Sequence, residues 1–353
     1  MKARIDPGIR FADIIHAARV RNASDLHLAA GHPAVARVDG TLTALSEGLF
    51  DSDELWSVAA GLMSDCNRTE FERSGDVSTS IDFGDGGRAR MHVLRTGGEP
   101  VLAVRLLDRE PPALERLNLP AVVSSLGQRE RGLVVLAGPT GCGKSTTMAA
   151  IVGDINRGYH RRIVTLEDPI EYRHYNRSSF ISQREIGLDA PTIQQALVGA
   201  LRADPDVLVV GEVRDANAMH TVLMAAETGH LVFVTLHTGT ASETVERIVD
   251  MFDGARQAQA RVALAETLVA VVCQRLVKGA VAGRRAVAEI LIATPALKSI
   301  IRQSKTYLIP NAIVTGRRHG MQTFAQHAAQ LAAEGEISLD TARRFEDART
   351  TAA

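Results

Sequence analysis

The chain has 353 residues, more than one hydrophobic core usually organises, so two domains are expected. Its 40 basic and 41 acidic residues give a net charge of −1, which argues against a dedicated nucleic-acid binder. Three scattered cysteines without a C-x-x-C pair argue against a disulfide framework or a zinc site, and no apolar run is long enough for a transmembrane helix. We therefore expect a protein of the reducing cytosol with no direct membrane insertion.

Residues 1–107 predict a small α+β domain. Helical spacing of apolar residues predicts helices over 11–20 and 55–63. Short runs of strand-forming residues predict five strands, over 26–28, 35–38, 79–83, 89–94 and 101–106. The paired prolines Pro111 and Pro112 then interrupt the pattern and stiffen the chain, so we place an interdomain linker at 108–114.

Residues 115–353 alternate between strand-like and helical runs, which predicts an α/β domain with a parallel sheet. The predicted strands cover 133–137, 162–166, 207–211, 231–236 and 286–291. The predicted helices lie near 144–156, 192–202, 214–228, 241–251 and 256–275. From about 295 to 353 the pattern is helical, with breaks at Pro310, Gly320 and Gly335.

A glycine-rich segment with the spacing G-x-x-x-x-G-K-S follows the predicted strand 133–137 and opens a helix. Its glycines allow backbone N–H groups to surround a phosphate, Lys144 can reach the β- and γ-phosphates, and Ser145 can ligate Mg²⁺. The sequence therefore predicts a nucleotide site made by Gly138, Pro139, Thr140, Gly141, Cys142, Gly143, Lys144, Ser145 and Thr146.

Two predicted strands end in acidic residues. Glu212 follows the apolar strand 207–211, which we expect to lie beside the phosphate loop, and is our candidate general base or water-positioning group. Glu167 comes directly after the predicted strand 162–166, and Asp168 and Glu171 follow it in the sequence. These three carboxylates are further candidates to bind or orient Mg²⁺ and water. Glu212 would hold the metal directly or through water.

Histidines and arginines supply further candidates. His230 and His237 bracket the strand 231–236, and the threonines around His237 suggest a sensor that reaches toward the γ-phosphate. Phosphoryl transfer needs positive charge, which arginine supplies well because its planar fork is always charged. If the small domain packs over the nucleotide, one or more of Arg88, Arg90, Arg95 and Arg105 act as arginine fingers. Otherwise these residues are ordinary exposed side chains of a strand face.

A co-linear set of motifs covers nearly the whole chain. It comprises 23–28 with 37–40, a Walker A segment at 138–146, an aspartate box at 166–171, the segments 182–187, 200–206 and 211–215 through Walker B, and a histidine box from 225–230 through 237–238. With these motifs the chain resembles the hexameric secretion ATPases of type IV pili and type II secretion. Within them it is most similar to the pilus retraction, or twitching motility, ATPases of the PilT type.

The resemblance implies a PAS-like domain over 1–107, a RecA-like ATPase domain over 115–353 and a helical C-terminal region from about 295. It implies a homohexamer that binds ATP and Mg²⁺ between domains, where Glu212, Glu167 and His237 act with arginines such as Arg90, Arg95 and Arg105. Such a motor would work in the cytoplasm at the inner membrane, on a pilus platform protein and not on nucleic acid.

One segment departs from the retraction pattern Ala-Ile-Arg-Asn-Leu-Ile-Arg-Glu. Here Lys298, Ser299 and Gln303 replace the arginine, asparagine and glutamate. An assembly or accessory motor of a related type II/IV secretion system therefore stays an alternative. A hexameric nucleic-acid translocase would need a run of basic or aromatic pore residues, which the sequence lacks. A regulatory subunit without ATP turnover is a third alternative, and the intact Lys144, Ser145, Glu212 and His237 argue against it.

Overall fold

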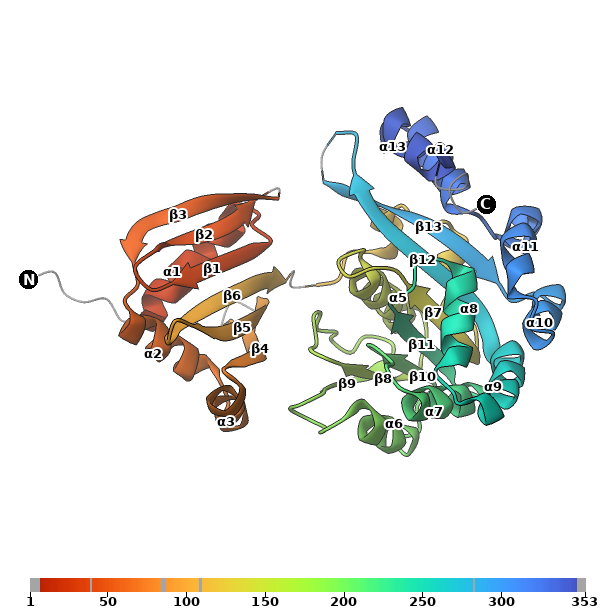
Figure 1. Cartoon of the computed structure of the whole chain (residues 1–353), viewed down its shortest axis with the longest axis horizontal. Coiled ribbons are helices and arrows are strands. Elements are labelled where there is room, and N and C mark those ends of the chain that lie inside the picture. Colours follow the sequence, from red (N-terminus) through yellow and green to blue (C-terminus); the bar gives the residue numbers. More distant parts are fainter. Residues whose placement is uncertain (1–6, 39, 84–86, 108–109, 282, 348–353) are drawn as a thin grey trace, which may run out of the picture. The chain divides into compact units, whose positions relative to one another are not determined.

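The computed structural model describes residues 7–38, 40–83, 87–107, 110–281 and 283–347. Its contacts divide the chain into two compact units, Met1–Glu110 and Pro111–Ala353 (Figure 1). The linker that we place at 108–114 includes residues 108 and 109, which lie outside the described part of the chain.

The first unit is a six-stranded antiparallel sheet in the order β3-β2-β1-β6-β5-β4. Apolar residues alternate along its strands, so Leu26, Met91 and Val104 face a core shared with the helices α1 and α2. The elements are α1 (Pro7–Val20), β1 (Asp25–Ala29), β2 (Pro33–Val38), β3 (Thr41–Leu49), α2 (Ser52–Leu62), α3 (Asp65–Ser74), β4 (Asp76–Asp82), β5 (Arg88–Thr96) and β6 (Glu99–Leu107). The structure confirms the predicted helices and strands of this unit and adds β3 and α3, which we did not predict.

The second unit is a seven-stranded sheet in the order β13-β12-β7-β11-β10-β8-β9. Every strand pair from β12 to β9 is parallel, and β13 runs antiparallel to β12. The strands are β7 (Gly132–Ala137), β8 (Arg162–Glu167), β9 (Phe180–Glu185), β10 (Val207–Val210), β11 (Leu231–Leu236), β12 (Leu268–Lys278) and β13 (Arg284–Ile292). The predicted α/β class is confirmed, with one antiparallel strand at an edge of the sheet.

Helices cover both faces of this sheet, and therefore β7, β10 and β11 are buried throughout and, apart from Thr235, carry no polar side chain. The turn η1 (Leu114–Leu117) and the helices α4 (Val122–Leu126) and α5 (Lys144–Gly158) share one core with the sheet. A second core contains α6 (Ile193–Leu201), α7 (Ala216–Glu227), α8 (Ala241–Asp250) and α9 (Gly254–Thr267).

The predicted helix over 256–275 is wrong in its second half. Helix α9 ends at Thr267, and the apolar residues that follow form β12, which pairs with β7 on one side and β13 on the other. A continuous apolar run of this length fits a buried strand as well as a buried helix, so its periodicity does not distinguish them. The edge strand β9 was also missed, because its sequence is mostly polar.

The C-terminal region is helical as predicted, through α10 (Pro295–Arg302), η2 (Thr306–Leu308), α11 (Ile309–Thr315), η3 (Arg317–His319), α12 (Phe324–Ala333) and α13 (Leu339–Asp347). Pro310 does not break a helix; it lies in the first turn of α11, where a missing N–H costs no hydrogen bond. Among the described residues, no helix combines the length and apolar character needed to cross a membrane.

Candidate active site

The parallel strands of the second unit bring the predicted catalytic residues to one edge of the sheet. The phosphate loop follows β7, His237 follows β11, Glu212 comes two residues after β10, and Glu167 ends β8. Because parallel strands place their carboxyl ends together, these four features lie along the same edge. The structure thus brings the four predicted features together, and their roles in catalysis stay predictions.

The order of the strands differs from our expectation in one respect. Strand β11 lies between β7 and β10, so the strand that carries Glu212 is not the immediate neighbour of the phosphate-loop strand. His237, which follows β11, therefore lies between the phosphate loop and Glu212 along this edge of the sheet. His230 precedes β11 at the opposite edge of the sheet, where its Nδ1 lies 2.9 Å from the carbonyl oxygen of Ala225.

The backbone of the phosphate loop depends on its glycines. Gly138, Gly141 and Gly143 have φ angles of 145°, 77° and 92°, which residues other than glycine rarely adopt. A Cβ on Gly138 would also stand 2.5 Å from the carbonyl oxygen of Gln274. Helix α5 begins directly after Gly143, which caps it without a side-chain hydrogen bond, so its positive N-terminal end is directed at the loop.

Lys144 is folded back into this loop. Its ammonium donates to the carbonyl oxygens of Gly138 and Pro139 at 2.6 and 3.0 Å, and its side chain is buried. Burial lowers the pKa of Lys144, and the nearby charges of Glu212 and Glu171 oppose that shift. A cation held among glycine-rich backbone fits a phosphate group, which would supply the missing negative charge.

Glu212 is held by two basic side chains. Arg214 donates to Oε2 at 2.8 Å, and His237 Nε2 lies 3.4 Å from Oε1. The hydrogen bond from Arg214 is the main reason that the pKa of Glu212 is lowered, and His237 adds to it. Glu212 is therefore a carboxylate at neutral pH, as a water-positioning group requires.

Glu167 belongs to a separate hydrogen-bonded group on β8 and β9. Its Oε1 accepts from the hydroxyl of Thr165 at 2.6 Å and from the amide of Gln183 at 3.1 Å. The loop after Glu167 returns to the phosphate loop, because the hydroxyls of Tyr172 and Thr146 lie 3.1 Å apart. Asp168 is exposed and Glu171 is half-buried beside this loop.

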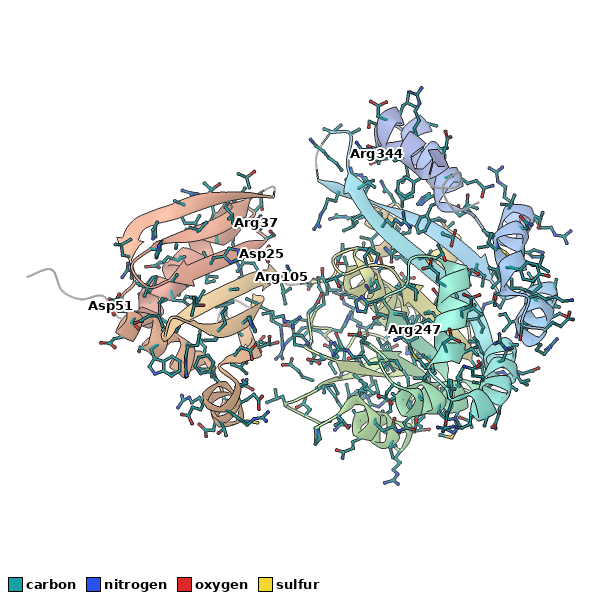
Figure 2. All side chains as sticks on the ribbon, in the orientation of Figure 1. Asp25, Arg37, Asp51, Arg105, Arg247 and Arg344 are labelled. Carbon is teal, nitrogen blue, oxygen red and sulfur yellow. The ribbon has the colours of Figure 1, made fainter. Side chains whose placement is uncertain are left out.

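The candidate arginines belong to the first unit. Arg105, labelled with Asp25 in Figure 2, donates to Asp25 at 2.9 Å. Arg90 is the cross-strand neighbour of Arg105. Arg95 lies over the ring of Phe71, with 5.1 Å between the guanidinium carbon and the ring centroid. Arg88 is buried and paired with Asp82. A contact of Arg90, Arg95 or Arg105 with a nucleotide stays a prediction.

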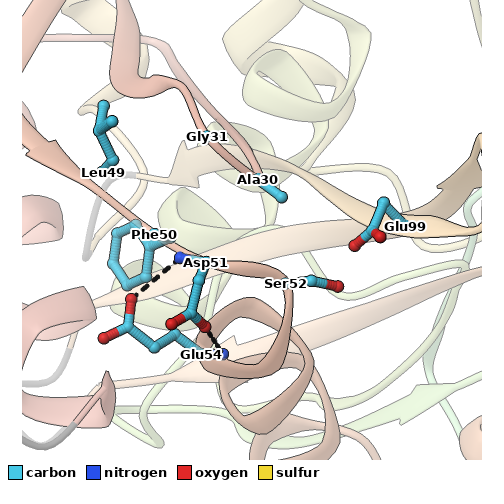
Figure 3. A pocket seen from close by; sticks show the side chains of 8 residues that line it. All are labelled: Ala30, Gly31, Leu49, Phe50, Asp51, Ser52, Glu54 and Glu99. Carbon is cyan, nitrogen blue, oxygen red and sulfur yellow. Dashed lines mark hydrogen bonds between the residues drawn. The ribbon is translucent and has the colours of Figure 1, made fainter.

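The first unit also contains a cavity of about 500 Å³ (Figure 3). Its carboxylates include Asp51 and Glu54, which cap α2: Asp51 accepts from the backbone of Glu54 at 2.8 Å, and Glu54 accepts from that of Asp51 at 3.0 Å. Glu99 adds a third carboxyl group to the lining. An acidic lining repels phosphate, so this cavity is not our candidate nucleotide site.

Sequence reasoning missed several residues that organise the active site. Arg214 could have been found, because it follows the predicted Glu212 by two positions. Thr165 precedes Glu167 by two positions on the same strand, so both side chains lie on one face of the sheet. Gln183 belongs to the segment 182–187 of the motif set, but its contact with Glu167 arises only because β9 pairs with β8.

The sequence of this chain is similar to those of known secretion and pilus proteins. Residues 6–344 match the family described as type II/IV secretion system protein. The chain is 38% identical to the type IV pilus retraction ATPase PilT of Pseudomonas aeruginosa over 92% of this chain and 94% of that protein. It is 34% identical to the type IV pilus ATPase PilU of the same organism, over 93% and 86% of the two chains.

A solved structure of the pilus retraction motor PilT with bound ADP resembles the present fold. The TM-score is 0.86 at 39% identity, and the match covers 94% of this chain and 96% of that one. The fold class that we expected, an N-terminal domain followed by a RecA-like ATPase domain, is confirmed.

Proposed function

This chain belongs to the family of type II/IV secretion system proteins, and we propose that it is the ATP-driven motor that retracts a type IV pilus. The observation that carries the proposal is the phosphate loop with Glu212, His237 and Glu167 along one edge of the sheet. The retraction ATPase PilT of Pseudomonas aeruginosa supports the same role through 38% identity over 92% of this chain.

In this proposal the phosphate loop and Lys144 bind the phosphates of ATP, and Ser145 holds the Mg²⁺ that accompanies them. Bound Mg²⁺ supplies positive charge to the oxygens of the phosphates during transfer. Glu212 orients the attacking water and accepts its proton, while His237 holds one oxygen of that carboxylate. Glu167 orients the water molecules around the metal from the neighbouring strand.

We further propose that six copies form a ring and that Arg90, Arg95 and Arg105 approach the bound nucleotide from the N-terminal domain. Positive charge from such arginines stabilises the transition state of phosphoryl transfer. Closure and reopening of this domain would then convert hydrolysis into movement of a platform protein at the inner membrane. The protein would work on the cytoplasmic side.

An assembly or accessory motor is the second candidate. Lys298, Ser299 and Gln303 depart from the pattern of the retraction ATPases, and the chain is also similar to PilU at 34% identity. Deleting the gene separates the possibilities. Fibres accumulate if the protein retracts them, fibres vanish if it assembles them, and slowed retraction with unchanged fibres indicates an accessory motor.

The ATPase step is tested by Lys144→Ala in the full chain. Removing the ammonium should abolish ATP turnover, measured as phosphate release, and leave the circular dichroism spectrum unchanged. Lys305→Ala is a matched control, because Lys305 is an exposed lysine of the same unit. Turnover that survives Lys144→Ala would contradict the proposed site.

A further inference from the structure

Gln183 has no role in the mechanism described above, although it touches the active site. It lies on the edge strand β9, directly opposite Thr165 of β8, and its side chain is half-buried. A polar side chain on an edge strand can turn toward water at little cost in free energy. Gln183 instead makes three hydrogen bonds within the protein.

The carboxamide of Gln183 uses both of its ends. Its Nε2 donates to Glu167 Oε1 at 3.1 Å and to the carbonyl oxygen of Tyr172 at 2.8 Å. Its Oε1 accepts from the backbone N–H of His174 at 2.8 Å. The reversed amide would set an oxygen against two oxygen acceptors, so these partners define its orientation.

The first of these bonds restricts the carboxylate of Glu167. The same oxygen, Oε1, accepts from the hydroxyl of Thr165 at 2.6 Å. Donors from two adjacent strands therefore hold one oxygen of Glu167 from two directions, which limits rotation of the carboxylate. Such outer contacts commonly fix the geometry of groups that bind a metal or its water.

The other two bonds hold the loop that follows β8. Gln183 fixes the main chain at Tyr172 and His174, and the hydroxyl of Tyr172 lies 3.1 Å from that of Thr146. Thr146 belongs to the first turn of α5, beside Ser145. One amide thus connects Glu167 with the helix that begins at the phosphate loop.

We propose that Gln183 is a positioning residue of the ATPase site, which orients Glu167 and fixes the loop that contacts the first turn of α5. The inference rests on the proposed ATPase function, because Glu167 matters only if the chain hydrolyses ATP. Gln183 acts through Glu167, so its loss should lower kcat much more than nucleotide affinity.

A double-mutant cycle in the full chain tests this inference. Gln183→Met preserves length and removes all three hydrogen bonds, and we expect kcat to fall about tenfold or more while the Kd of a fluorescent ADP analogue changes by less than about twofold. Adding Gln183→Met to Glu167→Gln should then cost little further activity, because both changes remove the same function.

Gln183→Glu, which keeps the shape of the side chain but loses its two N–H donors, should also lower kcat. Gln195→Met, at an exposed glutamine, is the control.

The possible results are distinct. If the losses from Gln183→Met and Glu167→Gln multiply, Gln183 does not act through Glu167 and the inference fails. Equal losses of kcat and ADP affinity with a lower Tm in both Gln183 variants would show a purely structural role, which also overturns it. If the unmodified protein shows no ATP turnover, the proposed function fails instead, whatever the variants do.

Discussion

The protonation of single residues at the active site depends on their immediate surroundings. Glu212 is held between Arg214 and His237, and Lys144 is held by backbone carbonyls of its own loop. The pKa of both groups is lowered, that of Glu212 by the hydrogen bond from Arg214 and that of Lys144 by burial. The first keeps a carboxylate charged, and the second favours binding of a group that restores the lysine's charge.

Arg214→Ala tests the first effect. Without the hydrogen bond from Arg214 the pKa of Glu212 rises, so a higher pH is needed to deprotonate the carboxylate. We expect the acidic limb of the pH profile of kcat/KM to move to higher pH. Arg202→Ala, at an exposed arginine of the same unit, should leave the limb in place. An unmoved limb in Arg214→Ala would show that Glu212 does not control it.

A buried histidine makes the stability of the second unit depend on pH. Burial lowers the pKa of His327 from 6.5 to about 4, and its Nδ1 accepts from the backbone N–H of Ala288 at 3.0 Å, which requires a neutral ring. Between these pH values the unfolded chain binds more protons than the folded one, so this stabilisation is present above pH 6.5 and is lost toward pH 4. The half-buried His174, whose pKa is also lowered to about 4, acts in the same direction.

Chemical unfolding at pH 7 and at about pH 4.5 measures this loss. We expect the free energy of unfolding to fall by about 2–3 kcal/mol from His327 alone, at about 1.4 kcal/mol for each pH unit of its depressed pKa. His327→Gln removes the titrating ring and should flatten the dependence. An equally steep dependence in that variant would contradict the assignment.

At the level of elements, α10 is anchored to the end of α9. Lys298 donates to the carbonyl oxygen of Glu266 at 2.8 Å, and Arg302 pairs with the side chain of the same residue at 3.2 Å. The carbonyl groups of a last helical turn lack partners within the helix, and nearby cations stabilise them. Lys298, which stands where the retraction pattern has an arginine, therefore connects α10 to the end of α9.

Lys298→Met should remove this contact. We expect the free energy of unfolding to fall by about 1 kcal/mol, because one hydrogen bond from a charged donor to a carbonyl is lost at a half-buried position. Urea unfolding measures the change, and Lys298→Arg should restore most of it. If Lys298→Met unfolds with the same free energy as the wild type, the contact between Lys298 and Glu266 does not stabilise the protein. ATP turnover should persist, because α10 carries no active-site residue.

For the whole molecule, the division between Glu110 and Pro111 separates the hydrophobic core of the first unit from those of the second. The residues of the first core all lie before this point, and those of the two larger cores all lie after it. A unit with its own core can fold alone. The proposed arginine donors and the phosphate loop lie on opposite sides of the division.

The fragments Met1–Glu110 and Pro111–Ala353 test this arrangement. Each should show a cooperative thermal transition, and the second should bind a fluorescent ADP analogue. Its ATP turnover should be at least about tenfold lower than that of the full chain, because Arg90, Arg95 and Arg105 are absent. Full turnover in the second fragment would exclude a catalytic role for these arginines.

The sequence alone was enough to predict the phosphate loop, the acidic residues near two strand ends and the position of His237, because each prediction depends on a local pattern of consecutive residues. The spacing of Gly138, Gly141 and Gly143 predicts the backbone of the phosphate loop, and the position of Glu212 just after an apolar strand predicts the edge of the sheet at which it lies. The tertiary structure decided what depends on pairing between distant segments. It placed β11 between β7 and β10, made β12 a strand after α9, and set Gln183 against Glu167. Local patterns do not specify these contacts, because strand order and register arise only when the whole sheet packs between its helices.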